Sequence, residues 1–299
     1  MKYAFYPGCT LESTAWDCEV STRAVCAALG IELEEIPDWS CCGSTPAHCS
    51  NTSLAVALPV LNLQKARDLA APVLTACASC YSRLRTANYK VRTEPEERER
   101  AERITGAPYG GEVEVHHFLD ALVNHYGIER IRERVTQPLH GLRVACYYGC
   151  LLSRPPKVVA FDDPENPTAM ERVVSALGAE PVEWPYRTEC CGAGLSLTHT
   201  EVVCRLGHRI LSMAQRAGAH CVAVACPMCQ VNLDLRQAEA GEAHGQLPET
   251  PIPYLTQLIG LALGLSPDAL GLDALFQSPH LLLQNVPQLA SGEERHGIE

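Results

Sequence analysis

The sequence has no long apolar run and no excess of positive charge. Its longest apolar stretch, LIGLALGL at 258–265, is too short to cross a bilayer. The opening residues, MKYAFYPGC, fall far short of a secretory signal. Acidic residues outnumber lysine and arginine by 35 to 24, a net charge of −11, which argues against nucleic acid because phosphate binding needs clustered basic residues. We therefore expect a cytoplasmic protein with no membrane span and no nucleic-acid partner.

Cysteine is the residue present in unusual number. The chain of 299 residues contains 16 cysteines. Disulfide scaffolds are typical of small secreted domains, whereas this chain is long, 46% hydrophobic and without a signal sequence. The cysteine count therefore favours metal or redox chemistry.

Ten of the cysteines form one pattern twice. A single cysteine is followed by Cys-Cys-Gly after 31 or 39 residues, and then by Cys-x-x-Cys after a further 34. The first cysteine group is Cys9, Cys41, Cys42, Cys77 and Cys80, and the second is Cys150, Cys190, Cys191, Cys226 and Cys229. The copies are offset by 149 residues from the double cysteine onward but by 141 at the first cysteine, so we place an 8-residue insertion in the Pro-rich stretch 154–167.

This duplication predicts two similar subdomains related by a pseudo-twofold axis. The linker-like TQPLHG at 136–141 places them at 1–138 and 139–299. An α/β fold is predicted, with a small parallel sheet flanked by helices in each half, because short apolar runs alternate with helical patterns. The predicted strands are 2–7, 31–36, 71–78, 142–148, 179–185 and 219–225. The predicted helices include 201–217 and a solvated helix at 94–103. A further helix is predicted within 266–299 and is followed by a frayed end.

The other six cysteines have no counterpart in the opposite copy. A ligand that both copies require should occur in both, whereas a packing residue need not. We therefore interpret these six as small buried hydrophobic residues: Cys18, Cys26, Cys49, Cys146, Cys204 and Cys221.

The motifs themselves indicate metal ligands. A Cys-x-x-Cys between an apolar strand and a helix places both sulfurs at a helix N-terminus, where the positive pole favours thiolate. Adjacent cysteines on a strand would point to opposite faces, so Gly43 and Gly192 are expected to allow a turn. Five thiolates exceed the four that tetrahedral zinc or a cubane cluster accepts. Either one cysteine of each group is a free reactive thiol, or the centre takes more than four.

The repeated pattern resembles the CCG-domain proteins, and especially the catalytic B subunit of heterodisulfide reductase. The resemblance covers Tyr3 to about Leu233 and includes YPGC and PENP. It implies that each cysteine group ligates one noncubane [4Fe–4S] cluster. It also implies that a small disulfide or thiol substrate docks between the two clusters, each of which supplies one electron and takes one sulfur.

The resemblance also implies partners. The ferredoxin run C-x2-C-x2-C-x3-C-P is absent, so electrons are expected from a ferredoxin-like C subunit that is fed by a flavoprotein, the A subunit. Two features depart from the archaeal members. Leu151 stands where those chains usually have a histidine suited to proton donation, and the first copy reads Cys-Cys-Gly where they often have Cys-Cys-Pro. A disulfide or thiol other than the methanogenic one fits equally well.

Further polar residues lie near the motifs. His48 and His199 are candidates for proton donors. Tyr6 and Tyr147 occupy matching places, where they would either pack over the clusters or donate hydrogen bonds to sulfur. The histidines of VHHF at 115–118 are interpreted as structural, at the start of a helix.

An anionic substrate would need positive charge nearby. Arg154 and Lys157, just after Cys150, are the candidates, with a solvated surface role as the alternative.

Three functions remain open from the sequence. The first is a disulfide or thiol oxidoreductase subunit of a larger complex. The second is an electron-relay CCG subunit of a dehydrogenase or quinone-linked complex without its own disulfide chemistry. The third is a non-redox zinc protein with two Cys-x-x-Cys pairs, which leaves six spaced cysteines unexplained.

Overall fold

The chain forms two parallel β-sheets, one from each half. The structure, a computed structural model, describes residues 1–286 except for the side chains of residues 45 and 46. The first sheet has the order β2-β1-β3-β4 and the second the order β6-β5-β7. The strands are β1 Lys2–Phe5, β2 Glu32–Glu35, β3 Val73–Thr75, β4 Val115–His117, β5 Arg143–Tyr147, β6 Glu180–Pro181 and β7 Cys221–Val224.

The two sheets share one arrangement, which confirms the predicted duplicated α/β fold. Tyr3 pairs with Leu33 in the first sheet, and Val144 pairs with Pro181 in the second. A parallel bridge from Val224 to Tyr254 extends the second sheet as β4 extends the first.

The expectation that residues 115–118 open a helix is wrong for the first three of them. They form strand β4, and the helix begins at Phe118. The strand is only three residues long and buried throughout, so it has no alternating pattern that the sequence could reveal.

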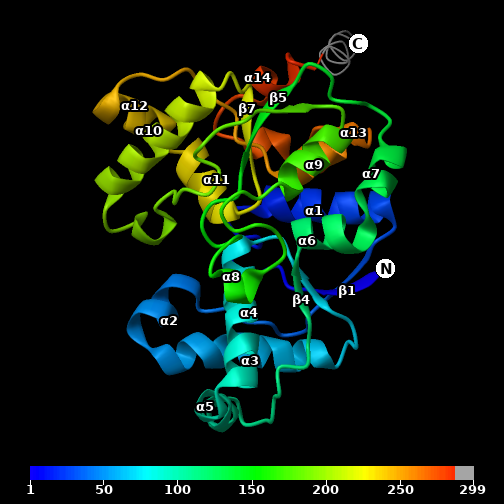
Figure 1. Cartoon of the computed structure of the whole chain (residues 1–299), viewed down its shortest axis with the longest axis vertical. Coiled ribbons are helices and arrows are strands. Elements are labelled where there is room, and N and C mark those ends of the chain that lie inside the picture. The colour runs from blue at the N-terminus through cyan, green and yellow to red at the C-terminus, as the bar shows by residue number, and fades with distance from the viewer. Residues whose placement is uncertain (287–299) are drawn as a thin grey trace.

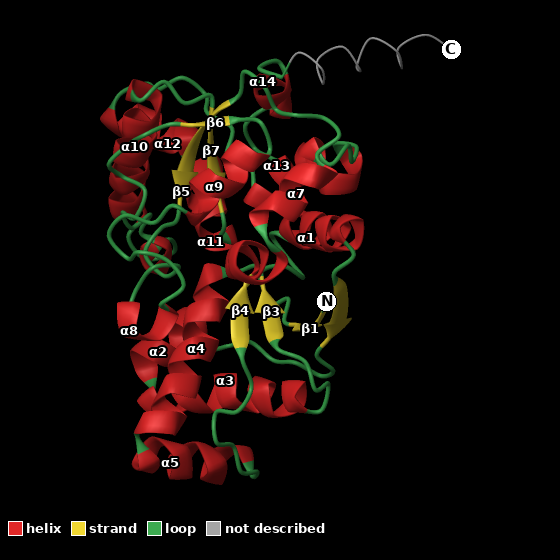
Figure 2. Cartoon of the chain, turned by 45° about the vertical axis from the view of Figure 1, so that its right-hand side comes forward, coloured by secondary structure: helices red, strands yellow, loops and turns green. Residues whose placement is uncertain are grey.

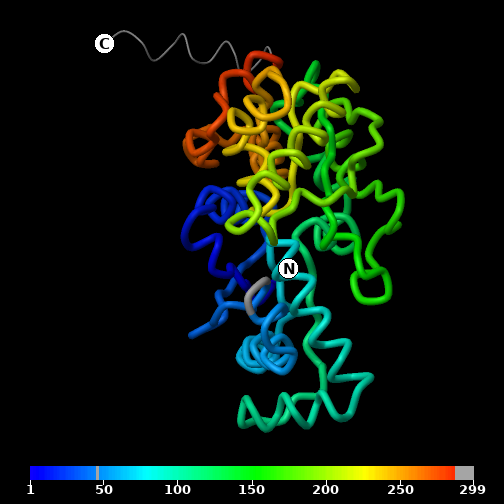
Figure 3. Tube along the Cα trace, turned by 90° about the vertical axis from the view of Figure 1, so that its left-hand side faces the viewer, coloured from blue at the N-terminus to red at the C-terminus, as the bar shows by residue number. Residues whose placement is uncertain are grey.

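The helices of the first half lie around its sheet and against the second half. They are α1 Trp16–Leu29, α2 Ser44–Ser50, α3 Thr52–Arg67, α4 Ala78–Thr93, α5 Pro95–Thr105, α6 Phe118–Asp120, the π-helical turn η1 Ala121–Tyr126 and α7 Ile128–Arg134. The solvated helix predicted at 94–103 is α5, which buries only Ala101. It lies at the end of the molecule farthest from the second half (Figure 3).

The second half contains more and shorter helices. They are α8 Pro156–Val159, α9 Ala169–Ala176, η2 Ala193–Leu195, α10 Thr200–Arg216, α11 Pro227–Asp234, α12 Gln237–His244, α13 Leu255–Ala262, η3 Asp268–Leu270, η4 Leu272–Ala274 and α14 Pro279–Leu283. The predicted helix at 201–217 is α10. Residues 266–286 form two 3-10 turns, the first of which follows Pro267, and the five-residue helix α14, which begins at Pro279. The predicted frayed end at 287–299 lies outside the described residues.

The halves interlock around one continuous core. Helix α1 of the first half packs against α13 of the second, where the buried Ser21 and Thr256 hydroxyls lie 2.7 Å apart (Figure 1). Helix α8, within the stretch expected to hold the insertion, packs against α4. There Arg85 Nε donates to Val158 O at 3.0 Å, and the Tyr81 hydroxyl donates to Val159 O at 3.2 Å. The boundary predicted at 138/139 falls between α7 and β5 and stays a prediction.

The carboxyl ends of the two sheets face each other. Strands β3 and β4 run toward the second half, and β5 runs toward the first (Figure 2). Because binding residues follow the carboxyl ends of parallel strands, the motifs of both halves meet in the middle of the molecule.

Two buried helical glycines test the packing around α13. A Cβ at Gly260 would overlap the buried Leu270 side chain, whereas a Cβ at Gly207 in α10 would meet nothing closer than 3.9 Å. Gly260→Ala should lower the free energy of unfolding by about 1–3 kcal/mol through overpacking. Gly207→Ala should leave it unchanged or raise it by up to about 1 kcal/mol through helix propensity. Anaerobic thermal melts measure both, and equal melting temperatures for the two variants would contradict the packing of α13.

Candidate metal centre

The first cysteine group converges at the carboxyl edge of its sheet. Cys9 Sγ lies 3.7 Å from Cys41 Sγ, and Cys42 Sγ lies 3.5 Å from Cys80 Sγ. The thiol pairs Cys41–Cys42 and Cys77–Cys80 also interact. The five sulfurs therefore form one contiguous group.

The second cysteine group repeats this geometry. Cys150 Sγ lies 3.9 Å from Cys190 Sγ, Cys191 Sγ lies 3.5 Å from Cys229 Sγ, and the Cys226 and Cys229 thiols interact. The exposure pattern is also repeated. In both groups the second cysteine of Cys-Cys-Gly and both cysteines of Cys-x-x-Cys are buried, while the other two reach toward solvent.

A left-handed turn explains how adjacent cysteines serve one centre. Gly43 has φ 72° and Gly192 has φ 79°, a region that residues with a Cβ rarely adopt. The turn also lets the Gly43 N–H donate to Cys41 Sγ at 3.4 Å and the Gly192 N–H donate to Cys190 Sγ at 3.3 Å. The predicted role of these glycines is therefore seen in both halves.

The YPGC and YYGC segments leave room for sulfur. A Cβ at Gly8 would lie 2.9 Å from Cys80 Sγ, and one at Gly149 would lie 3.1 Å from Cys229 Sγ. Any larger residue would push the loop away from the cysteines.

Within each group, a hydrogen bond between two thiols favours thiolate at one cysteine and raises the pKa of its partner. Hydrogen bonds from the Cys41 and Cys80 thiols hold the pKa of Cys42 well below its usual range. The Cys150 thiol lowers the pKa of Cys190 to about 6. Thiolate is the form that binds metal, and the Cys-x-x-Cys motifs sit at the N-termini of α4 and α11, as predicted. The donor set fits an iron–sulfur centre in each half.

His117 joins the two halves between the cysteine groups. The Cys77 and Cys226 thiols interact with each other, and the alanines before them hydrogen-bond to one imidazole. His117 Nε2 lies 3.2 Å from Ala76 O and 3.1 Å from Ala225 O. The Leu119 N–H donates to Nδ1, so Nε2 carries the proton and donates to both carbonyls. Burial lowers the pKa of His117 to about 4, so the ring is neutral at pH 7.

The side chain of the neighbouring His116 contacts a different set of residues. Its Nδ1 lies 2.8 Å from Asp120 Oδ2, and its ring lies 4.2 Å from the His125 ring, measured between centroids. Both histidines of VHHF thus contact protein groups, and their structural interpretation stays a prediction.

A cleft of about 420 Å³ opens beside the second cysteine group, with α2 and α4 of the first half opposite. All five cysteines of the second group line it. Its other lining residues are Ser44, His48, Cys49, Ala78, Ser79, Arg83, Tyr148, Leu151, Gly192, Ala193, Gly194, Leu195, Leu206 and Met228.

The structure separates the residues suggested as proton donors. His48 lines the cleft. His199 lies outside the cleft lining, with Nδ1 3.5 Å from Glu201. The Tyr6 and Tyr147 hydroxyls donate at 2.6 Å to Ser40 O and Glu189 O, the carbonyls just before each Cys-Cys-Gly, rather than to sulfur. Burial and the nearby cysteines raise the pKa of both phenols.

The structure agrees with the solvated alternative for Arg154 and Lys157, and it corrects the expectation for one cysteine. Arg154 pairs with Glu165 at 3.1 Å, and both Arg154 and Lys157 are exposed outside the cleft lining. The arginine in the cleft is Arg83, three residues after Cys80. The sequence does not predict that Arg83 lies near Cys150, because the two residues are far apart along the chain. Five of the six unmatched cysteines are buried as predicted, but Cys49 is exposed because α2 carries it on the cleft side.

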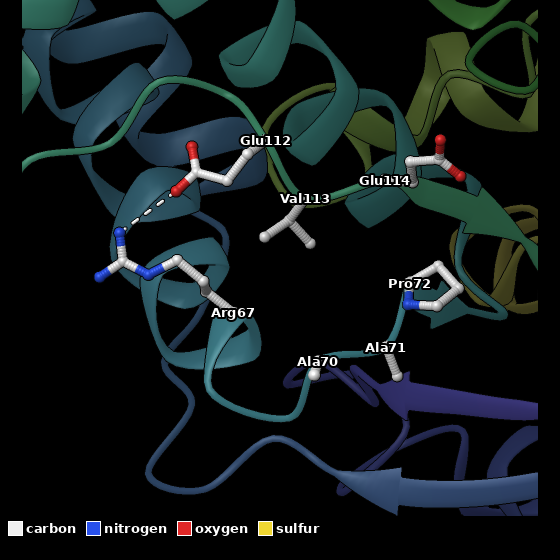
Figure 4. Close-up of a pocket in the computed structure, with 7 residues that line it drawn as sticks. All are labelled: Arg67, Ala70, Ala71, Pro72, Glu112, Val113 and Glu114. Carbon is white, nitrogen blue, oxygen red and sulfur yellow. Dashed lines mark hydrogen bonds and ion pairs between the residues drawn. The ribbon is translucent and has the colours of Figure 1, made fainter.

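A second hollow, of about 330 Å³, lies at the opposite edge of the first sheet (Figure 4). It is lined by residues just before β3 and β4, and its arginine, Arg67, is paired with Glu112 at 3.2 Å. No cysteine lines this hollow.

The fold and site define a protein with two cysteine-rich units, each suited to a metal–sulfur centre. A family model, the CCG cysteine-rich domain, matches residues 3–85 and 144–234. The chain belongs to this family of CCG cysteine-rich-domain proteins. Within residues 1–286, none of the helices combines the length and apolar character needed to span a membrane.

Curated relatives match over most of their length. The chain is 34% identical to the membrane anchor subunit of 8-methylmenaquinol:fumarate reductase from Wolinella succinogenes, over 91% of this chain and 95% of that one. It is 31% identical to the B subunit of ferredoxin:CoB-CoM heterodisulfide reductase from Methanosarcina mazei, over 91% and 92%. A protein of Archaeoglobus profundus, named as similar to the heterodisulfide reductase B subunit, is also 31% identical, over 90% and 92%. The family and these relatives identify an oxidoreductase-type iron–sulfur protein of electron transfer.

A solved structure shares the fold. A hypothetical protein from Helicobacter pylori superimposes with a TM-score of 0.73 at 12% identity, covering 93% of this chain. This chain spans about half, 52%, of that one.

The two hydrogen bonds by which His117 joins the halves can be tested by substitution. His117→Leu leaves two buried carbonyls without a donor and should lower the free energy of unfolding by about 2–4 kcal/mol. His117→Gln retains a donor and should cost less. The control is His140→Leu, since His140 also meets a carbonyl, Gly178 O, but at an exposed position. Anaerobic unfolding of the wild type and the three variants measures the effect. Equal losses of unfolding free energy in His117→Leu and His140→Leu would contradict a role of His117 in joining the halves.

Proposed function

We propose that this chain is the iron–sulfur catalytic subunit of a cytoplasmic heterodisulfide reductase-like complex that reduces or forms a disulfide between two noncubane [4Fe–4S] clusters. One observation carries the proposal. Two complete groups of five sulfurs face each other, with Cys77 and Cys226 in contact and a cleft alongside. The five cysteines of the second group line one side of this cleft, so part of its volume would be taken by the second centre, and the rest, toward α2 and α4, is available to a sulfur compound.

The proposed ligands are all ten repeated cysteines. Five thiolates per half exceed the needs of a cubane cluster or a tetrahedral zinc ion, which supports a noncubane cluster in each half. The first cluster would be held by Cys9, Cys41, Cys42, Cys77 and Cys80, and the second by Cys150, Cys190, Cys191, Cys226 and Cys229.

The chemistry requires two electrons and two protons. Cleavage of the S–S bond yields two thiols, and the reverse reaction releases both protons and both electrons. When bound, the two clusters supply or accept these electrons. The chain contributes a cleft that holds the sulfur compound against the second cysteine group, and His48 as a proton site at its imidazole. The Arg83 charge lowers the pKa of His48, which favours the neutral ring. As a proton site, His48 would take up one proton when a disulfide forms and return one when a disulfide is cleaved.

The proposed electron partners are the ferredoxin-like C subunit of such a complex and, through it, the flavoprotein that forms its A subunit. Cys9 and Cys41 are exposed and lie outside the cleft lining. The first centre is therefore accessible to a docking partner while the cleft remains open to the substrate.

A second candidate function is electron relay in a quinone-linked complex. It is favoured by the 34% identical relative named as a subunit of a methylmenaquinol:fumarate reductase. In that case both centres conduct electrons, and no sulfur compound reacts in the cleft.

Metal analysis tests both candidates against the zinc alternative. Anaerobically purified protein should contain about eight irons and about eight acid-labile sulfides, as two four-iron clusters require. Cys191→Ser removes a buried ligand of the second group and should lower the iron content to about half. Cys221→Ser, at a buried cysteine of β7 without a counterpart, should leave it unchanged. Stoichiometric zinc without sulfide would contradict both iron–sulfur functions.

Thiol trapping separates disulfide chemistry from relay. Oxidised protein mixed with candidate thiols should give a new, thiol-dependent paramagnetic signal, because the thiol sulfur binds at a centre. Electron paramagnetic resonance detects it, with the corresponding alcohols as the control. If every thiol leaves the spectrum unchanged while a quinol reduces the protein, the relay function is favoured instead.

A further inference from the structure

Three ligand-type side chains lie together outside both cysteine groups. His116 in β4, Asp120 at the end of α6 and His125 in η1 each offer one nitrogen or oxygen atom, and these atoms all lie within 4.8 Å of one another. His116 and Asp120 are buried, whereas His125 is exposed, so the group is open to solvent on one side. None of the three residues lines the cleft beside the second cysteine group.

The π-helical turn η1 brings His125 to this place. Residues five positions apart lie about 140° apart around an α-helix of 3.6 residues per turn, so an α-helix would separate His125 from Asp120. In a π-helix the hydrogen bonds join residues five apart, as from the Gly127 N–H to Leu122 O at 2.9 Å, and such residues lie one above the other. Turns of this kind are rare and occur frequently at functional sites.

The second half shows that the repeated fold forms without this group. His117 and Tyr254 occupy matching places, because each directly precedes a helix and the carbonyls three residues before them, of Glu114 and Pro251, accept from β3 and β7. The regular helix α13 stands where the first half has α6 and η1. The counterparts of His116, Asp120 and His125 are Pro253, Gln257 and Ala262, none of which is a histidine, cysteine or carboxylate residue.

Surrounding groups orient the two buried side chains. Asn124 Nδ2 donates to Asp120 Oδ1 at 2.7 Å, which leaves Oδ2 to face His116 Nδ1 at 2.8 Å. His116 Nε2 lies 3.5 Å from Glu114 Oε2, so Nε2 can keep a proton while Nδ1 offers its lone pair to a metal ion. Amide and carboxylate partners of this kind fix the tautomer and the orientation of metal ligands.

We propose that His116 Nδ1, Asp120 Oδ2 and a ring nitrogen of His125 bind one zinc-like divalent transition-metal ion, with water as a further ligand on the exposed side. Two imidazoles and a carboxylate are a donor set that suits zinc, which they bind at about 2.0–2.2 Å. Ligand atoms around tetrahedral zinc are about 3.3 Å apart, so the three atoms need to approach by no more than about 1.5 Å. The exposed His125 side chain can supply this movement.

The ion would tie β4 to η1 directly beside His117, the residue that joins the halves. Its binding would release the Nδ1 proton of His116 in place of the hydrogen bond to Asp120. The site is separate from the ten repeated cysteines and from the proposed disulfide chemistry, because no sulfur takes part in it.

Zinc titration tests the site. Anaerobically purified, cluster-loaded protein is freed of loosely bound metal with a chelator and titrated with zinc in a calorimeter, with magnesium as the control ion. The variants are His125→Gln, at an exposed position, and Asp120→Asn, at a buried one. The control variant is His140→Gln, which removes an exposed histidine whose ring meets the backbone carbonyl of Gly178. Iron and sulfide are measured for each protein, so that only variants with intact centres are compared.

The wild type should bind one zinc ion per chain in addition to its iron, and no magnesium, which prefers oxygen ligands. Loss of an outer partner of a metal ligand costs about 10–100-fold in affinity, so loss of the ligand itself in His125→Gln should weaken zinc binding by about 100-fold or more. Asp120→Asn should weaken it similarly, and His140→Gln should bind zinc as the wild type does.

Three results would overturn the site: no one-to-one zinc binding by the wild type, zinc binding by His125→Gln as tight as that of the wild type, or equal weakening in His125→Gln and His140→Gln. Each of them would leave the iron and sulfide contents, and with them the proposed function, untouched. If Asp120→Asn does not fold, the exposed pair His125→Gln and His140→Gln decides.

Discussion

The structure depends on the meeting of two parallel sheets at their carboxyl ends, held by the neutral imidazole of His117. Its Nε2–H donates to the carbonyls of Ala76 and Ala225, the residues that precede the two Cys-x-x-Cys motifs. This pair of hydrogen bonds links the two halves one residue before each motif. Without it, two buried carbonyls would lose their donor at the point where the halves meet.

The duplicated positions and the altered ones have different tasks. Where the copies agree, as in Gly8 and Gly149 or Tyr6 and Tyr147, the residues make matching contacts around the cysteines. Where they differ, their contacts differ too: Arg83 lines the cleft, whereas Asn232 lies outside its lining and donates to Cys191 O. The repeated residues thus build two similar centres, and the altered residues make the surroundings of the two centres different.

Some elements can be predicted from the sequence and others cannot. The strands that precede the cysteine motifs are predictable because their apolar runs are continuous and end at a marked turn. Strand β4 cannot be predicted in this way, because its three residues are all buried and show no alternation of apolar and polar side chains. The exposure of Cys49 is also hidden, because the side that α2 turns toward the cleft depends on its packing against α3 and α4.

The sequence by itself determined the ligand-type residues and their twofold repetition, because spacing along the chain and the need for thiolates at helix N-termini are local properties. Only the tertiary structure decided that the two groups face each other, that His117 joins them, and that Arg83 rather than Arg154 or Lys157 lies in the cleft. These features depend on contacts between residues far apart in the chain, such as His117 with Ala225, 108 positions apart, and Cys77 with Cys226, 149 positions apart, which no local pattern encodes.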